Sequence, residues 1–268
     1  MKIGIAGSKG FVGTSFKSYL KARHISYSVL DDDLRVIDNF NCDQDIETLV
    51  LLASLKPKFG INIDMHEYLN DNYLIVLNAL EYCRQVGAKL IYVSTFLYDL
   101  NSSLPIDEHS PIVAKSPYQF SKLLGEQLCK YYSEKNGVNT IILRPSNVYS
   151  GQKNSGNFVD TLMDSRYINH DIFSPRDRRD FIHVSDLCDA ILEGCEKVKD
   201  YTFEVFNIGS GRSNTKHEII AALGISDRCN IQDSIEEPTD TQYCISKAFN
   251  LLGWSPKIDL VEFLTRDT

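Results

Sequence analysis

A tyrosine and a lysine four residues apart, Tyr118 and Lys122, are the residues of this sequence that point most directly to catalysis. Residues at this spacing share one face of a helix. A free tyrosine loses its proton only near pH ~10, and a neighbouring ammonium favours the phenolate. Tyr118 would then act as an acid or base near neutral pH. Ser94 follows an apolar run and would hydrogen-bond the same substrate oxygen. Because any exposed helix can carry Tyr-x-x-x-Lys, this interpretation depends on the surrounding elements.

The first of these elements is a turn that contains Gly7, Gly10 and Gly13. It separates an apolar run over 1–6, which reads as a buried strand, from a segment with helical spacing over 14–20. The first glycine allows a tight reversal, the second lets a pyrophosphate approach the backbone, and the third lets the helix pack closely on the strand. The first N–H groups of the helix would face the phosphates. The alternative is an ordinary glycine-rich turn.

A second apolar run, 25–30, ends in three carboxylates, Asp31, Asp32 and Asp33. This is where the ribose hydroxyls of a dinucleotide would lie, although an acidic loop that only solvates a turn is the alternative. Asp31 would accept a hydrogen bond from the ribose 2′-hydroxyl and repel a 2′-phosphate, and the next two carboxylates add to that repulsion. Lys9 and Arg35 are the only nearby bases that would support NADP. The sequence therefore favours NAD(H), with NADP left open.

Strands and helices alternate along the first 150 residues. We expect strands over 48–54, 89–93 and 140–143, and helices over 71–86 and 118–136. This alternation predicts an α/β fold with a Rossmann-type, doubly wound parallel sheet. The gap before residue 48 is short, so we expect a compressed sheet there. Ligands bind at the carboxyl ends of such strands, which would collect these residues in one crevice: Gly7, Asp31, Ala53, Ser94 and Arg144.

The sequence changes character after residue 150. We predict a dinucleotide-binding domain over 1–150 and a smaller substrate-binding subdomain over 151–268, with interleaved segments. A helix is expected over 185–198, and Thr215 with Glu218 fits a capping box. We expect this half to close over the crevice as a lid.

Composition excludes several classes of protein. The 268 residues carry 36 acids against 28 bases, a net charge of −8, which argues against a nucleic-acid partner. No apolar run is long enough for a membrane span, and the N-terminus does not read as a signal peptide. The seven cysteines form no Cys-x-x-Cys pair, so we expect reduced thiols, a cytoplasmic protein and no metal site.

Taken together, these motifs resemble the extended short-chain dehydrogenase/reductase family, the NAD-dependent epimerase/dehydratase group that modifies nucleotide sugars. The resemblance spans nearly the whole chain. It is carried by the glycine turn, Asp31, and these further segments: 51–54, Asn72, Asn78, 93–98, Tyr118-x-x-x-Lys122, 143–149, 179–184, 206–209 and 252–256.

The resemblance implies three sets of site residues. The catalytic set is Ser94, Tyr118 and Lys122. The cofactor would be held by Gly7, Gly10, Phe11, Val12, Gly13, Asp31, Asp32, Leu52, Ala53, Ser54, Lys56, Asn72, Tyr118, Lys122, Pro145 and Ser146. The nucleotide-sugar substrate would be held by Ser94, Thr95, Tyr118, Asn147 and Arg179. Arg179 would meet the diphosphate, which suits a guanidinium fork, unless it is a surface residue balanced by Asp177 and Asp180.

Departures from the family pattern exclude some of the family's reactions for this chain. The family's 4,6-dehydratases carry Asp-Glu where this chain has Thr95 and Phe96, so elimination lacks its acid and base. The double epimerase-reductases need a further acid at the position of Phe96. A 4-keto reductase or a 4-epimerase remains. The short chain and Ser150, where the family usually has glycine, favour the reductase. A non-catalytic dinucleotide sensor or a purely structural role would leave Tyr118 and Lys122 unexplained.

The family also implies a homodimer built on a four-helix interface. Helices 71–86 and 118–136 would form it, with contacts from Tyr73, Tyr82, Tyr131 and Tyr132. Aromatic residues on helices more often belong to a core, which is the alternative for these four.

Overall fold

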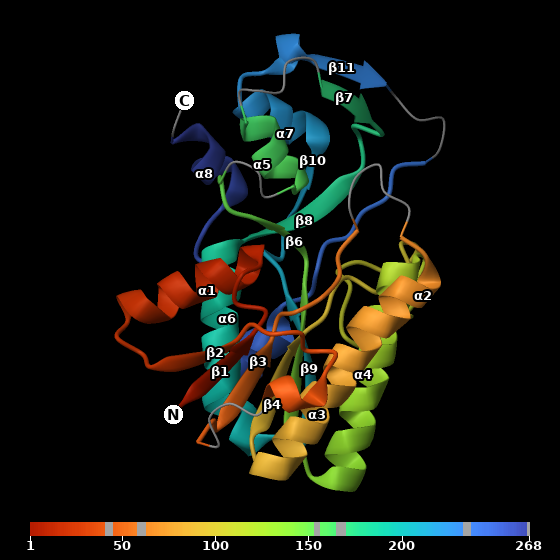
Figure 1. Ribbon diagram of the computed structural model, residues 1–268. Helices are drawn as coiled ribbons and strands as arrows, with labels where there is room; N and C mark the ends of the chain where they lie inside the picture. The colour runs from red at the N-terminus through yellow and green to blue at the C-terminus, as the bar shows by residue number, and fades with distance from the viewer. Residues whose placement is uncertain (41–44, 58–62, 153–155, 165–169, 233–236, 267–268) are drawn as a thin grey trace. The chain divides into compact units, whose positions relative to one another are not determined.

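The chain was analysed as a computed structural model that describes residues 1–40, 45–57, 63–152, 156–164, 170–232 and 237–266. It divides into two compact units (Figure 1). The first unit comprises Met1–Leu97, Ile112–Arg144 and Cys188–Phe206. The second unit comprises Tyr98–Pro111, Pro145–Leu187 and Asn207–Thr268.

A six-stranded sheet forms the centre of the first unit, in the order β2-β1-β3-β4-β5-β9. Neighbouring strands from β2 to β5 run parallel. All residues of β1 and β3 are buried, as their continuous apolar runs predict. The strands are β1 Ile3–Ala6, β2 Tyr27–Leu30, β3 Thr48–Leu51, β4 Lys89–Val93, β5 Thr140–Pro145 and β9 Phe203–Ile208.

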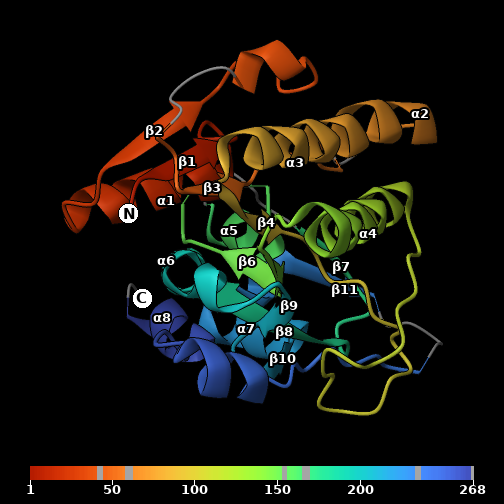
Figure 2. The same cartoon turned by 90° about the horizontal axis from the view of Figure 1, so that it is seen from below.

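Helices cover both faces of this sheet, which confirms the predicted doubly wound, Rossmann-type fold. In Figures 1 and 2, α3 and α4 lie side by side on one face, and α1 and α6 lie on the other. The hydroxyl of Tyr19 on α1 donates a hydrogen bond to Asp189 on α6. The helices are α1 Phe11–Ala22, α2 Met65–Tyr68, α3 Leu74–Val86, α4 Pro117–Asn136 and α6 Val184–Lys197, with short turns η1 Ile37–Phe40, η2 Leu69–Tyr73 and η3 Val198–Asp200.

The helix predicted over 71–86 begins earlier than expected. Asp64 caps its start by accepting a hydrogen bond from the backbone N–H of Glu67, and helical structure continues through α2, η2 and α3 to Val86. The segment η2 is a π-turn, whose extra residue shifts the phase of the apolar positions. Its polar residues Asn70, Asp71 and Asn72 also hide the amphipathic pattern, so sequence periodicity detects only the later part of the helix. Gly87 ends it in the left-handed conformation, as predicted.

The second unit has two small sheets and its own apolar core. One sheet has the order β10-β8-β6, and the other pairs β11 with β7. The core gathers residues such as Tyr149, Phe181 and Leu260. The predicted capping box of Thr215 and Glu218 is present at the start of α7. The elements are β6 Asn147–Tyr149, α5 Phe158–Met163, β7 His170–Phe173, β8 Arg178–His183, β10 Ser213–Thr215, α7 Lys216–Ala222, η4 Ser226–Arg228, β11 Cys229–Gln232, η5 Ala248–Leu252 and α8 Leu260–Thr265.

Candidate active site

The carboxyl ends of β1 to β4 meet at one edge of the first unit's sheet. Ala6, the last residue of β1, pairs with Leu30 of β2 and with Leu51 of β3, and Leu51 pairs with Tyr92 of β4. The residues that follow these strands therefore lie along the same edge: Gly7, Asp31, Leu52, Ala53, Ser54 and Ser94. This confirms the predicted placement of these residues at one edge. Arg144 lies level with Ser94, because Leu143 pairs with Val93, but its buried guanidinium is hydrogen-bonded to Glu126.

The glycine turn is packed tightly at two of its three glycines. Gly7 has a φ of +91°, and a Cβ there would lie 2.4 Å from the backbone nitrogen of Ala53. A Cβ on Gly13 would lie 2.2 Å from the carbonyl oxygen of Gly7. At Gly10 the nearest atom would be 3.5 Å away, so the protein's own packing does not demand a glycine there. Its missing side chain leaves the backbone open to close approach by a ligand, as a pyrophosphate site requires.

The helix that follows this turn begins at Phe11, with Gly10 as its N-cap. Phe11, Val12 and Gly13 are therefore the first helical turn, and their N–H groups carry the positive end of the helix dipole. Helix α1 thus starts earlier than the apolar spacing over 14–20 suggests. The Lys56 ammonium lies 5.9 Å from the centre of the Phe11 ring, which brings the loop after β3 beside this turn.

A cavity of about 460 Å³ opens beside the glycine turn, and acidic residues line much of its wall. Asp31 accepts hydrogen bonds from the backbone N–H and the hydroxyl of Ser8, at 3.2 and 2.9 Å. The Lys9 ammonium lies 4.0 Å from the same carboxylate. The cavity is lined by Gly7, Lys9, Gly10, Leu30, Asp31, Asp32, Asp33, Leu34, Arg35, Ala53, Asp71 and Ile75. An open glycine backbone with carboxylates beside it fits a dinucleotide, and ribose binding by Asp31 stays a prediction.

Helix α4 brings Tyr118 and Lys122 to the end of β4. Ser116 caps the helix by accepting a hydrogen bond from the backbone N–H of Gln119, and Pro117 occupies its first turn, where a missing N–H costs nothing. The Lys122 ammonium donates to the carbonyl oxygen of Val93, at 2.7 Å. The side chains of Ser54 and Thr95 act on the Tyr118 hydroxyl and lower its pKa. The two helix residues thus contact the residues immediately before and after Ser94.

Ser94 has a buried hydroxyl that is left for another molecule. The residue is 4% exposed, and its Oγ has no hydrogen-bond partner among the residues that the structure describes. Its backbone N–H donates to Leu143 of β5, which fixes the residue at the strand end. A buried hydroxyl without a partner costs free energy, so this atom is suited to receive a substrate oxygen.

The Lys122 side chain is buried, so its ammonium is removed from water. Burial lowers its pKa to about 7, while the carboxylate of Glu126 one turn along α4 opposes this shift. The ammonium also lies 4.3 Å from the centre of the Tyr92 ring. Lys122 can therefore gain or lose a proton near neutral pH.

The pKa of Tyr118 moves opposite to our expectation. Burial raises it, the side chains of Ser54 and Thr95 lower it less, and the ring of Tyr68 lies 6.0 Å away, centre to centre. The sequence predicted a lowering by the ammonium of Lys122 and by the positive ring of a bound nicotinamide. In the structure that ammonium is bonded to Val93 instead, so desolvation of the phenol dominates.

Asn72 uses every polar atom of its side chain within the protein. Its Oδ1 accepts from the backbone N–H of Leu55 and from the hydroxyl of Ser54. Its Nδ2 donates to the carbonyl oxygen of Leu55 and to the hydroxyl of Ser121, which in turn donates to the carbonyl oxygen of Tyr118. These contacts tie the loop after β3 to α4. They indicate that Asn72 positions the site, whereas its predicted contact with the cofactor stays a prediction.

The second unit holds the remaining predicted residues, which follow β5 or lie on β8. The Ser146 hydroxyl donates to Asp180 at 3.0 Å, and Asn147 donates to the carbonyl oxygen of Asp180 at 2.9 Å. Arg179 pairs with Asp177 at 3.1 Å and also donates to backbone oxygens. Pro145 is the last residue of β5 and is buried. Binding of a diphosphate by Arg179 stays a prediction and would require its guanidinium to exchange partners.

The buried pair of Glu126 and Arg144 was missed by sequence reasoning. Two hydrogen bonds join them, at 3.0 and 2.6 Å, and the two residues are 3% and 4% exposed. Glu126 lies four residues after Lys122 on the same helix face, which was the available signal. The pair places a carboxylate, itself paired with a guanidinium, one helical turn from Lys122.

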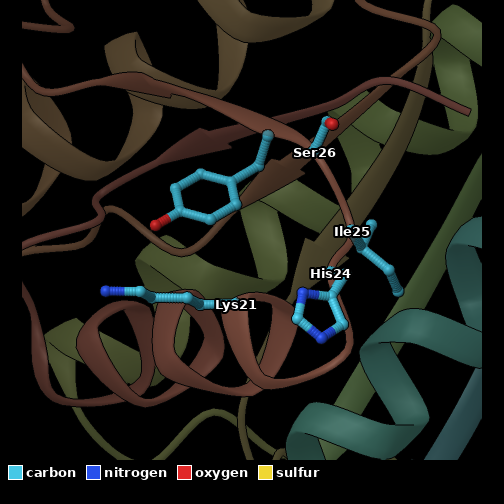
Figure 3. A pocket seen from close by; sticks show the side chains of 5 residues that line it. Lys21, His24, Ile25 and Ser26 are labelled. Atoms are coloured by element: carbon cyan, nitrogen blue, oxygen red, sulfur yellow. The ribbon is translucent and has the colours of Figure 1, made fainter.

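A further cavity of about 460 Å³ lies away from this edge, where α1 ends and β2 begins (Figure 3). Lys21, His24, Ile25, Ser26 and Tyr27 line it. His24 has a φ of +56° because it terminates α1, with its N–H bonded to the carbonyl oxygen of Lys21. This cavity lies at the amino end of β2, so it takes no part in the crevice at the carboxyl ends.

Comparison with known proteins gives the family. The model of the NAD dependent epimerase/dehydratase family matches residues 3–209. The chain belongs to this family. The match confirms the resemblance expected from the motifs, and NAD(P) binding is supported by solved structures of the same fold that are complexes with NAD or with NADPH.

Individual relatives of this epimerase/dehydratase chain differ in their reactions. A provisional UDP-glucose 4-epimerase of Methanocaldococcus jannaschii is 28% identical over 92% of this chain and 83% of its own length. GDP-L-fucose synthase 1 of Arabidopsis thaliana is 24% identical over 99% of this chain and 91% of its own length. Among solved structures, UDP-glucose 4-epimerase from Thermotoga maritima with UDP-glucose superimposes with a TM-score of 0.86 at 22% identity, covering 99% and 96% of the two chains. The comparisons therefore establish the family, whereas relatives with different reactions leave the reaction of this chain open.

Two features are absent from the described residues. These residues contain no group of three or more His, Cys, Asp or Glu side chains arranged to hold a metal ion. None of the helices in these ranges has the length and apolar character needed to cross a membrane.

Proposed function

We propose that this family member transfers hydride between NAD(H) and a carbinol or keto carbon of a nucleotide-linked sugar. The observation that carries the proposal is the position of Ser94, whose buried hydroxyl has no partner among the described residues. The residue before it, Val93, accepts a hydrogen bond from Lys122, and the residue after it, Thr95, lowers the pKa of Tyr118. A sugar oxygen that accepts from Ser94 at this place would be within reach of the Tyr118 phenol. Tyr118 would give that oxygen a proton in reduction and remove it in oxidation.

The protein would contribute orientation and charge. Bound NAD(H) supplies the hydride, or accepts it, beside the carbon that bears this oxygen. The first turn of α1, with Gly10 as its cap, would hold the pyrophosphate, and Asp31 the ribose hydroxyls. Lys122, with a pKa near neutrality, would compensate the charge that develops on Tyr118.

Two reactions remain compatible with this site, and a 4-epimerase is now the first candidate. The relatives include UDP-glucose 4-epimerases, among them proteins that align with most of this chain. A 4-epimerase would use the same residues twice: Tyr118 would take the proton of the sugar hydroxyl while hydride leaves the carbon, and it would return the proton to the same oxygen when hydride is added to the other face of the carbon. The sequence alone favoured a 4-keto reductase, and the relative named GDP-L-fucose synthase keeps that reaction as the second candidate.

A substrate panel separates the two reactions. The full chain is incubated with NAD⁺ and UDP-glucose, and separately with NADH or NADPH and nucleotide-linked 4-keto-6-deoxy sugars. A 4-epimerase inverts the sugar without net consumption of dinucleotide. A reductase consumes NADH in a stoichiometric amount, which absorbance follows. Absence of both reactions across the panel, in a protein that binds dinucleotide, would favour the non-catalytic sensor.

The predicted homodimer also stays a proposal. Tyr131 on α4 is 58% exposed and is available for a contact between copies, whereas Tyr82 and Tyr132 are buried in the core of the first unit. Light scattering at micromolar concentration is expected to give the mass of two chains. A single-chain mass would remove the dimer without affecting the catalytic proposal.

A further inference from the structure

Two carboxylates from separate segments hold Arg35, a base on the wall of the acidic cavity. Its Nε and Nη2 donate to the two oxygens of Asp33, each at 2.8 Å, and its Nη1 donates to Asp71 at 3.0 Å. Arg35 and Asp33 lie in the loop after β2, whereas Asp71 lies in the π-turn η2. We call these three residues the Arg35 clamp. The clamp is partly exposed, with side-chain exposures of 49% for Arg35, 46% for Asp33 and 28% for Asp71.

The clamp determines the charge that a bound ribose would meet. The charged residues of the cavity wall are four carboxylates and two cations: Asp31, Asp32, Asp33, Asp71, Lys9 and Arg35. Each cation already lies against a carboxylate, Lys9 against Asp31 and Arg35 against the other two clamp residues. The wall is therefore net negative, and its one guanidinium is already neutralised.

We propose that Asp33 and Asp71 determine cofactor specificity, because by holding Arg35 they make the cavity select a dinucleotide with a free 2′-hydroxyl over one with a 2′-phosphate. This inference rests on the proposed function, since it concerns the same dinucleotide site. A 2′-phosphate carries up to two negative charges and is recognised best by a free guanidinium fork. Here three of the five N–H groups of Arg35 are used and two carboxylates oppose the phosphate. A ribose hydroxyl is neutral and meets no such repulsion.

The competing explanation is that the clamp only stabilises the loop after β2. That loop has another anchor, since the carbonyl oxygen of Leu34 accepts a hydrogen bond from Asn78 at 3.1 Å. The two explanations differ in their consequences. A structural clip would affect NADH and NADPH equally, whereas a specificity device changes the ratio of their affinities and requires Arg35.

The test measures the dissociation constants of NADH and NADPH by fluorescence titration of the full chain, with no sugar substrate. The wild type is expected to bind NADH at least about tenfold more tightly than NADPH. In Asp33→Asn/Asp71→Asn, affinity for NADPH should rise about tenfold relative to NADH, because Arg35 becomes free to meet the phosphate. Adding Arg35→Gln to this variant should remove the gain. Asp71→Asn alone leaves the two bonds to Asp33 and should give a smaller change in the same direction.

Each result has one meaning. An unchanged ratio in the double variant, equal binding of both dinucleotides by the wild type, or a gain that survives Arg35→Gln would each overturn the inference. Thermal unfolding checks that the variants are folded, and if the double variant is not, the single Asp71→Asn variant decides. Failure of the wild type to bind either dinucleotide would instead overturn the proposed function.

Discussion

The ammonium of Lys122 donates a hydrogen bond to the carbonyl oxygen of Val93, 2.7 Å away, and so fixes helix α4 against the end of strand β4. Ser94 is the next residue, and the side chain of Thr95 after it lowers the pKa of Tyr118. One helix face therefore contacts both sides of a buried serine. This relationship places the three residues proposed for catalysis together, and the predictions below depend on it.

Replacing Tyr118 with Phe removes the proposed acid and keeps the ring. We expect turnover to fall about 10²- to 10⁴-fold, which is the usual contribution of a general acid or base. Affinity for NADH should stay unchanged, because the glycine turn and Asp31 are intact. Steady-state kinetics on the substrate found by the panel, with NADH titration as the control, checks this. A variant that turns over at the wild-type rate would show that Tyr118 is not the proton donor.

Two glycine substitutions should separate folding from cofactor binding. In Gly10→Ala the new Cβ would lie 3.5 Å from its nearest neighbour, so we expect a loss of stability of at most ~1 kcal/mol but weaker dinucleotide binding. Gly7→Ala forces a side chain into the left-handed region and 2.4 Å from the Ala53 nitrogen. It should cost more than ~2 kcal/mol of stability. Thermal unfolding and NADH titration of both variants test this, and full NADH affinity in Gly10→Ala would count against the pyrophosphate site.

Lys122→Met should inactivate the enzyme and stabilise the fold. Because burial lowers the pKa of Lys122 to about 7, the folded state binds its proton less well than the unfolded state does. Above the ordinary pKa of lysine the side chain is neutral in both states, so it does not change the free energy of unfolding. As the pH falls from that pKa toward 7, the unfolded state takes up the proton first, and the free energy of unfolding decreases. The variant should be more stable by about 2 kcal/mol at pH 7, after allowance for the lost hydrogen bond to Val93, and the gain should vanish in strongly basic solution.

Urea unfolding of this variant at several pH values provides the measurement. Lys122→Arg is the matched control, because it keeps the charge and should show no gain. If Lys122→Met were less stable than the wild type at neutral pH, the charge of Lys122 would be a net stabiliser of the fold.

Breaking the Glu126–Arg144 pair on one side should destabilise the first unit strongly. Glu126→Gln leaves the guanidinium of Arg144 buried without its counter-charge, which typically costs about 3 to 5 kcal/mol. Glu126→Leu with Arg144→Met removes both charges and should recover most of the loss. Denaturant unfolding of the single and double variants gives the coupling between the residues. If the single and the double variant lost the same free energy of unfolding, the packing of these two side chains, and not their charge pairing, would stabilise the first unit.

The sequence predicted the arrangement of the sheet better than the partners of individual side chains. The glycine turn, the buried run before Ser94, the strand before Asp31 and the cap at Gly87 follow from local rules, because each depends on a few neighbouring residues. The bond from Lys122 to Val93 and the pair of Glu126 with Arg144 join residues far apart in the chain. No periodicity reports such contacts, and burial reverses the pKa shift that was expected for Tyr118.

The start of the helix before α3 shows a second limit. A π-turn shifts the pattern by one residue and places the polar Asn72 inside the protein, where it binds Ser54, Leu55 and Ser121. An amphipathic pattern cannot anticipate a buried asparagine at such a turn. The role of Asp71 in holding Arg35 was missed for the same reason.

The most direct test of the account is a crystal structure of the full chain with NAD⁺ and the nucleotide sugar that the panel identifies. We predict that the Ser94 Oγ and the Tyr118 hydroxyl both lie within about 3 Å of one sugar oxygen, with the nicotinamide against the carbon that bears it. A sugar bound with that oxygen away from either hydroxyl, or a dinucleotide bound away from Gly10, would contradict the account.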